Sequence, residues 1–228
     1  TPQSDATREQ DAIFMQLRDA ARKNDADKAA ELAARLPNYA IPSYVDYYRL
    51  KPRLRDASNE EIQDFLKRYE GSAIADRLRN DWLLELGRKR DWANFDRELP
   101  LFVKNDDYQV KCYALLSRAS KGQNVAAEAR VLLDNPPLYG EACAALVNQL
   151  VQSGQFTPAD LLAQLRLAGE MHATGPSRRT ALLLDASDTR AAQAVDLPAV
   201  VLARGVGNTR AEHEIYLVAI GRVARTSL

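Results

Sequence analysis

The sequence predicts an all-α protein, and three observations lead to that prediction. Ala and Leu are the commonest residues while Val, Ile and Thr are sparse, a balance that favours helices over strands. Gly and Pro number 10 each among 228 residues, which is few for a chain rich in β-turns. Apolar residues recur at helical spacing almost throughout, and no convincing run alternates apolar with polar residues.

The apolar stripes place the helices along the chain. Clear i, i+3, i+4, i+7 stripes are Ile62, Phe65, Leu66 and Tyr69; Cys112, Leu115, Leu116 and Ala119; and Cys143, Leu146, Val147 and Leu150. The expected helices are 7–22, 26–36, 42–54, 59–69, 73–89, 92–103, 106–120, 124–134, 138–153, 158–170, 176–184, 188–195, 197–204 and 210–226.

Helix-start signals agree with these ranges. Thr7, Ser58 and Thr209 each stand three residues before a Glu or Gln, the spacing of a capping box in which a hydroxyl accepts from the N3 amide. Thr157 precedes Pro158, so a capping hydroxyl stands before a proline suited to the first helical position. Glycines such as Gly122 fall where the helices should stop.

Short turns between these helices predict antiparallel neighbours. Similar turn segments recur about every 33 residues, close to the ~34-residue period of tetratricopeptide arrays. They are Arg88-Lys89-Arg90-Asp91, Lys121-Gly122-Gln123-Asn124 and Ser153-Gly154-Gln155-Phe156, and a similar segment, Arg22-Lys23-Asn24-Asp25, lies two periods earlier. We therefore expect a right-handed, tetratricopeptide-like superhelix of antiparallel hairpins, with an irregular bundle as the alternative. No Gly/Ser-rich or charged linker divides the chain, so one domain over 1–228 is expected.

Composition narrows the range of partners. Lys and Arg total 31 and Asp and Glu total 31, which gives no electrostatic footprint for nucleic acid. The longest apolar runs, 197–203 and 215–220, fall far short of the ~20 residues of a membrane span. No charged-then-apolar leader stands at Thr1, so we expect any targeting peptide to have been removed already.

No constellation of residues predicts catalysis, a cofactor or a metal. His172 and His213 have no second His or Cys at ligand spacing, and each is better explained near a helix end. Gly205 and Gly207 begin a glycine pattern that Arg210 interrupts, so nucleotide binding is not expected. The Asp and Glu residues fall at caps or on polar faces, where none has the apolar surroundings of a general acid.

Tyrosines gather at one place, after the helix break near Tyr39. Tyr44, Tyr47 and Tyr48 share a face at i, i+3, i+4, and Arg49 follows them. Such a cluster can form a surface that binds a sugar or peptide, or on which further domains dock. The plainer interpretation, which we favour, is a core between two helices with hydroxyls at its rim.

Two cysteines occupy equivalent places on apolar stripes about one repeat apart. Neighbouring hairpins would bring Cys112 and Cys143 close together. A metal site would need more ligands, and a catalytic cysteine would need a base nearby. The sequence therefore leaves two possibilities for this pair, two buried thiols or one disulfide. A disulfide would indicate an oxidising compartment.

Three ordered segments resemble the soluble lytic murein transglycosylase family. They are residues 36–50 (LPNYAIPSYVDYYRL), residues 74–83 (IADRLRNDWL) and Arg90-Asp91-Trp92. The Cys112 and Cys143 pair, on two helices with a Gly-Gln turn between them, is similar to a cysteine pair of that family. With the matched helical registers, the resemblance favours a Cys112–Cys143 disulfide.

The resemblance implies a function as well as a fold. Members of the family are periplasmic bacterial enzymes that cleave the β-1,4 bond between N-acetylmuramic acid and N-acetylglucosamine, leaving a 1,6-anhydromuramoyl end. Their N-terminal U-shaped superhelix joins a linker superhelix in a ring, and a C-terminal domain carries the catalytic Glu in a Glu-Ser motif. This chain has no Glu-Ser dipeptide, so it is expected to be an inactive superhelical piece that lies beside glycan strands and further domains. The alternative is a free-standing repeat scaffold for a protein or peptide.

Overall fold

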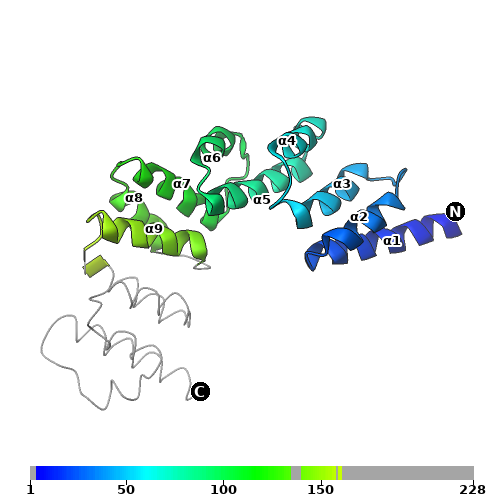
Figure 1. Ribbon diagram of the computed structural model, residues 1–228, viewed down its shortest axis with the longest axis horizontal. Coiled ribbons are helices and arrows are strands. Elements are labelled where there is room, and N and C mark those ends of the chain that lie inside the picture. The colour runs from blue at the N-terminus through cyan, green and yellow to red at the C-terminus, as the bar shows by residue number, and fades with distance from the viewer. Residues whose placement is uncertain (1–3, 135–139, 158, 161–228) are drawn as a thin grey trace, which may run out of the picture. The chain divides into compact units, whose positions relative to one another are not determined.

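The computed structural model describes residues 4–134, 140–157, 159 and 160, and no strand occurs among them. The all-α prediction is therefore confirmed for this part of the chain (Figure 1). The elements are α1 (Asp5–Arg22), α2 (Ala26–Ala34), α3 (Pro42–Leu50), η1 (Lys51–Arg53), α4 (Asn59–Arg68), α5 (Ala73–Lys89), α6 (Trp92–Glu98), η2 (Leu99–Leu101), α7 (Tyr108–Ser120), α8 (Ala126–Leu133) and α9 (Glu141–Gln152). The helices expected over 176–184, 188–195, 197–204 and 210–226, and 158–170 except residues 159 and 160, lie outside the described residues.

The chain forms two compact units, Thr1–Asn105 and Asp106–Leu228. In the first, α1 packs against α2 and α3, while α5 contacts α3, α4 and α6 (Figure 1). Its largest fully buried side chains come from several helices and form the hydrophobic core. They are Leu17, Tyr47, Ile62, Phe65, Leu78, Trp82, Leu83 and Phe95.

The described part of the second unit is built on α7, which contacts both α8 and α9. Its described core is mainly aliphatic, with Tyr113 and Phe156 also buried, and the two cysteines belong to it. The side chains with no exposed surface include Val110, Cys112, Ala129, Leu133, Cys143, Leu146 and Leu150. The stripes expected on 112–119 and 143–150 are therefore the buried faces of α7 and α9.

A residue with positive φ lies in the turn that ends each of four helices, at the positions of the expected repeat. These residues are Asn24 (57°), Arg90 (60°), Gly122 (84°) and Gly154 (74°). After Asn24 and Arg90 the next amide donates back across the turn, from Asp25 to the Ala20 carbonyl and from Asp91 to the Leu86 carbonyl, each at 2.9 Å. These bonds satisfy helix-end carbonyls, which explains why the turn recurs.

The predicted helix starts were right at Ser58 and wrong at Thr7. Ser58 is the N-cap of α4, and its hydroxyl accepts from the Glu61 amide at 3.2 Å. The Glu61 carboxylate does not complete the box as expected, because it pairs with Arg53. At the N-terminus, Ser4 caps α1 by accepting from the Thr7 amide at 3.3 Å, so Thr7 lies within the first turn.

Prolines shorten two helices relative to their predicted ranges. The range 42–54 is α3 followed by the 3₁₀ turn η1, which contains Pro52. The range 92–103 is α6 followed by η2, which contains Pro100. A proline has no amide to donate to a carbonyl of the preceding turn, so the α-helical hydrogen bonding is interrupted and a 3₁₀ turn follows at each place.

The side chain of Asp160 links the turn that follows α9 to helix α8. The Thr157 amide donates to its carboxylate at 2.8 Å, and its own amide donates to the Thr157 hydroxyl at 3.3 Å, as the expected cap requires. Arg130 of α8 donates through Nε and Nη2 at 2.9 and 3.1 Å. The hydrogen bond from Arg130, with those from Thr157, lowers the pKa of Asp160 from 3.8 to about 2.

Replacing Asp160 by Asn should destabilise the fold in a pH-dependent way. The lowered pKa means that the charged carboxylate stabilises the folded chain above pH 3.8, and that this contribution is lost as the pH falls toward 2. We expect a loss of about 1 kcal/mol in the free energy of unfolding at pH 7, since Arg130 is partly exposed. Urea unfolding of both proteins at pH 7 and at acid pH measures it.

The matched control is Asp106→Asn, which removes an exposed carboxylate elsewhere in the second unit. The difference between wild type and Asp160→Asn should shrink at the acid end, whereas the control should differ little at either pH. An equal loss at both pH values would show that the carboxylate acts through its shape and not its charge.

Candidate functional site

The tyrosines singled out in the sequence lie mostly in the core. Tyr47 has no exposed surface, and its hydroxyl donates to Asp81 Oδ2 of α5 at 2.6 Å. The guanidinium of Arg77 lies 5.1 Å and the ammonium of Lys51 5.6 Å from the centre of the Tyr47 ring. Burial, reinforced by the Asp81 charge and hydrogen bond, raises the pKa of Tyr47. The hydroxyl therefore stays a donor and joins α3 to α5.

Tyr48 is also buried, which reduces the surface that this cluster offers. Its ring packs edge-on against Tyr47 at 5.2 Å and Phe14 of α1 at 5.8 Å between centroids. Tyr44 is half-buried, and Arg49 is exposed with its guanidinium 3.5 Å from Asp46. Of the four residues expected at a glycan or docking surface, only Tyr44 and Arg49 reach solvent to a useful extent.

The sequence did not reveal that this aromatic cluster extends to α1. Phe14 stacks on Tyr39, with ring centroids 4.9 Å apart and planes 17° from parallel. Phe14 has no aromatic neighbour in the sequence, so spacing alone gave no signal.

Tyrosine hydroxyls bind carboxylates of neighbouring helices elsewhere in the chain as well. Tyr39 donates to Asp11 at 2.8 Å, Tyr69 donates to Asp46 at 2.5 Å, and Tyr113 donates to Glu141. Each pair joins segments more than 20 residues apart along the chain. These tyrosines therefore link helices to one another, and they bind three carboxylates for which the sequence pattern predicted no partner.

A groove of about 470 Å³ opens in the first unit beside the start of α5. Its walls come from the end of α4, the first turns of α5 and the chain that follows η2. The lining residues are Leu66, Glu70, Gly71, Ser72, Ala73, Ala75, Asp76, Arg79, Leu101, Val103 and Lys104. Nothing in the sequence pattern predicts this groove, because its walls meet only after folding.

Two carboxylates beside this groove are buried, which corrects the expectation that all lie at caps or on polar faces. Asp76, 9% exposed, accepts from the amides of Val103 and Lys104 at 2.8 and 3.1 Å. Glu98, 6% exposed, pairs with Arg79 at 3.3 Å. Both are bound by donors of the fold itself, so they hold the groove wall in place and are not placed as a general acid.

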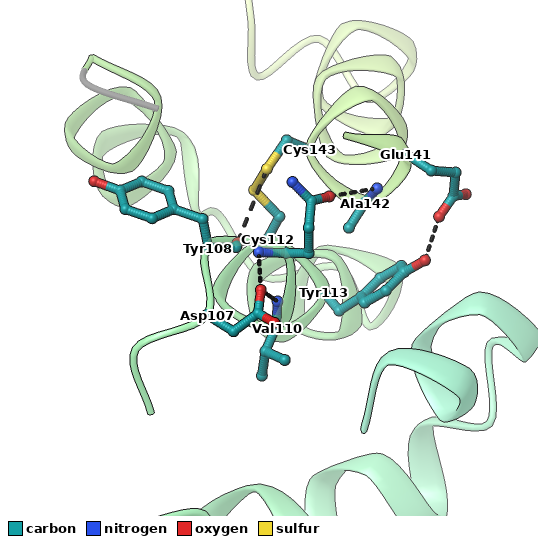
Figure 2. Close-up of a disulfide and its surroundings, with 9 residues drawn as sticks. Asp107, Tyr108, Val110, Cys112, Tyr113, Glu141, Ala142 and Cys143 are labelled. Carbon is teal, nitrogen blue, oxygen red and sulfur yellow. Dashed lines mark hydrogen bonds between the residues drawn. A yellow bond between two sulfur atoms is a disulfide. The ribbon is translucent and has the colours of Figure 1, made fainter. Parts of the chain in front are cut away.

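The predicted disulfide is confirmed: Cys112 of α7 is bonded to Cys143 of α9 (Figure 2). Their Cα atoms are 5.0 Å apart across a sequence separation of 31. Around it, Gln109 Oε1 accepts from the Ala142 amide at 3.0 Å and so satisfies a donor at the start of α9. A Cβ added at Gly140 would lie 2.6 Å from the end of the Gln109 side chain, so a larger residue there would require Gln109 to move.

Metal-ligand clusters and membrane-spanning helices are both absent from the described residues. Within 4–134, 140–157, 159 and 160, no three His, Cys, Asp or Glu side chains gather as metal ligands would. Over the same stretches, no helix has the length and apolarity to cross a membrane. The segments with His172, His213 and the glycines at 205 and 207 lie outside the described residues.

Comparison with solved structures finds the same fold in the soluble lytic transglycosylases. The 70-kDa enzyme Slt70 of Escherichia coli matches with a TM-score of 0.61 and 23% identity, over 97% of this chain and 37% of that one. The 70-kDa soluble lytic transglycosylase in complex with bulgecin A matches with a TM-score of 0.60, at the same identity and coverage. An inactive mutant of the lytic transglycosylase Slt of Pseudomonas aeruginosa has a TM-score of 0.53 and 22% identity, over 93% of this chain and 36% of that one.

The resemblance read from residues 36–50, 74–83 and 90–92 is thus confirmed as a likeness of fold. The chain spans just over a third of the length of these solved proteins. No protein-family model and no curated protein matches the sequence.

Reduction of Cys112–Cys143 should destabilise the chain by about 3–4 kcal/mol, the chain-entropy cost for a loop of this length. Urea unfolding with and without reductant measures the loss, and intact mass should rise by two hydrogens on reduction. The variant Cys112→Ser with Cys143→Ser should match the reduced wild type and ignore reductant. Two thiols that alkylate freely in unreduced, denatured protein would contradict the disulfide.

Proposed function

We propose that this chain is a non-catalytic helical part of a soluble lytic transglycosylase that acts on peptidoglycan. The observation that carries the proposal is the match of 97% of this chain to only 37% of Slt70. A match of that form is expected when one region of a larger enzyme is compared with the whole. The parent protein would cleave the bond between N-acetylmuramic acid and N-acetylglucosamine and release 1,6-anhydromuramoyl products.

In this proposal the chain serves as a scaffold. Residues 1–228 form one superhelical domain of tetratricopeptide-like hairpins, which helps to close a ring and to position glycan strands. Its partners are those strands and the C-terminal domains of the same polypeptide. The recurring turns at Asn24, Arg90, Gly122 and Gly154 support a repeat architecture.

The disulfide supports a periplasmic location. Disulfides persist in oxidising compartments such as the periplasm and are rare in the cytosol. Cys112 and Cys143 are both fully buried in the core between α7 and α9, so the bond is part of the fold.

The alternative function is a free-standing repeat scaffold that binds a protein or peptide. The groove beside α5 supports this alternative. It is lined by acidic and basic side chains as well as apolar ones, and such a groove can bind a peptide. The length of the native reading frame separates the two. A frame that continues several hundred residues to a Glu-Ser motif supports the transglycosylase, and a frame that ends near Leu228 supports the free scaffold.

The isolated chain should bind purified sacculi but release no anhydromuropeptides from them. Cleavage needs a general acid with a raised pKa in an apolar site, and both buried carboxylates of the described residues, Asp76 and Glu98, are already bound by the fold. Co-sedimentation with sacculi measures binding, and chromatography of the soluble fraction measures release. A heat-inactivated sample is the control.

Two results would contradict this reading. Failure to co-sediment with sacculi at any concentration tested would remove the proposed function. Anhydro-sugar products that disappear on substitution of a carboxylate in this chain would show that it holds a catalytic site of its own.

A superhelix should also be visible in solution. A compact globule of 228 residues has a radius of gyration of about 17 Å. Because stacked hairpins contact only their neighbours, we expect small-angle scattering to give a clearly larger value. A radius at the compact limit would instead indicate the irregular bundle.

A further inference from the structure

Two charges in the groove beside α5 have no partner among the described residues. The exposed carboxylate of Glu70 follows α4, and the exposed ammonium of Lys104 follows η2. Neither side chain makes a hydrogen bond or ion pair within the part of the chain that the structure describes. The two charges are opposite in sign and come from different walls of the groove.

The remaining charged side chains of the groove, Asp76 and Arg79, are bound by groups of the fold and hold its walls in place. Asp76 binds the backbone amides of Val103 and Lys104, so it fixes the position from which the Lys104 side chain extends. Arg79 pairs with Glu98 and also donates to the Leu101 carbonyl at 3.2 Å. The groove is therefore formed in advance, and binding need not pay for ordering its walls.

The groove also presents apolar surface that the fold leaves uncovered. Val103 is 85% exposed and Leu101 is 52% exposed, although both lie in the wall held by Asp76 and Arg79. Leu66, Ala73 and Ala75 add small or aliphatic side chains, and none of the described lining residues is aromatic. Recognition there would rest on charge and on small apolar groups, not on stacking against a ring.

We infer that this groove binds a short peptide that carries both a free ammonium and a carboxylate, with small apolar side chains between them. The ammonium would meet Glu70, the carboxylate would meet Lys104, and methyl groups would cover Leu101 and Val103. A volume of about 470 Å³ is within the range of small-ligand sites. Resting on the proposed function, the peptide is the stem peptide of peptidoglycan, in which alanines flank a glutamate and a diamino acid with a free ammonium.

The test is binding of the synthetic tetrapeptide N-acetyl-L-Ala–γ-D-Glu–diaminopimelate–D-Ala, whose single free ammonium is that of diaminopimelate, to the 228-residue chain, measured by titration calorimetry. Lys104→Met and Glu70→Gln should each weaken binding about three- to fivefold, as expected for single solvent-exposed ion pairs. Acetylating the free ammonium of the peptide should weaken binding to the wild type, but should change little in Glu70→Gln. Lys28→Met and Glu31→Gln are matched controls, because they remove exposed charges on α2 away from the groove and should leave affinity unchanged.

The outcomes separate this inference from the proposed function. If the chain co-sediments with sacculi but the tetrapeptide does not bind, or binds equally to all four variants, the groove inference is overturned and the proposed function stands. Competition by glycan strands stripped of peptide would also overturn it. If the tetrapeptide binds with the expected charge dependence but sacculi are not bound, the peptide chemistry is supported and peptidoglycan as its source is overturned.

Discussion

The contact between neighbouring helices is the interaction on which the described fold depends. Its α-helices run from 7 to 18 residues, and isolated helices of this length are at best marginal in water. Each must therefore bury its apolar stripe against another helix. Within the first unit, α5 buries Leu78, Trp82 and Leu83 almost wholly and contacts α3, α4 and α6.

The polar groups of the fold are arranged to permit that packing. A buried tyrosine such as Tyr47 contributes a large apolar ring to the core, and its hydroxyl is satisfied by Asp81 across the helix interface. Asp76 satisfies backbone donors in a similar way. Its carboxylate accepts hydrogen bonds from the amides of Val103 and Lys104, which lie outside any helix and have no helical carbonyl to bond. The groove beside α5 results from these hydrogen bonds. They hold the chain after η2 near α5, while the side chains of Leu101 and Val103 remain exposed to solvent.

Local features could be predicted from the sequence, and features that join distant segments could not. The bounds of α4 follow from its stripe and its Ser58 cap, and the proximity of the two cysteines follows from their matching helical registers. Thr7 misled because Ser4, three residues earlier, competes for the same role. Asp76 could not be recognised as buried, since its donors lie 27 and 28 residues further along the chain. The candidate site shares this limit, because its walls belong to segments that meet only in the folded unit.

The disulfide determines whether a single cut in the backbone separates this chain into two molecules. Cys112 and Cys143 close a covalent ring through the peptide chain of α7, α8 and the start of α9. A protease that cuts once inside the ring produces two new termini, yet the two pieces remain one molecule until the sulfur bond is broken. A cut outside the ring leaves two pieces that no covalent bond joins. A protease that cuts just before Cys112 therefore separates the chain into two molecules, whereas one that cuts just after it leaves a single disulfide-linked molecule.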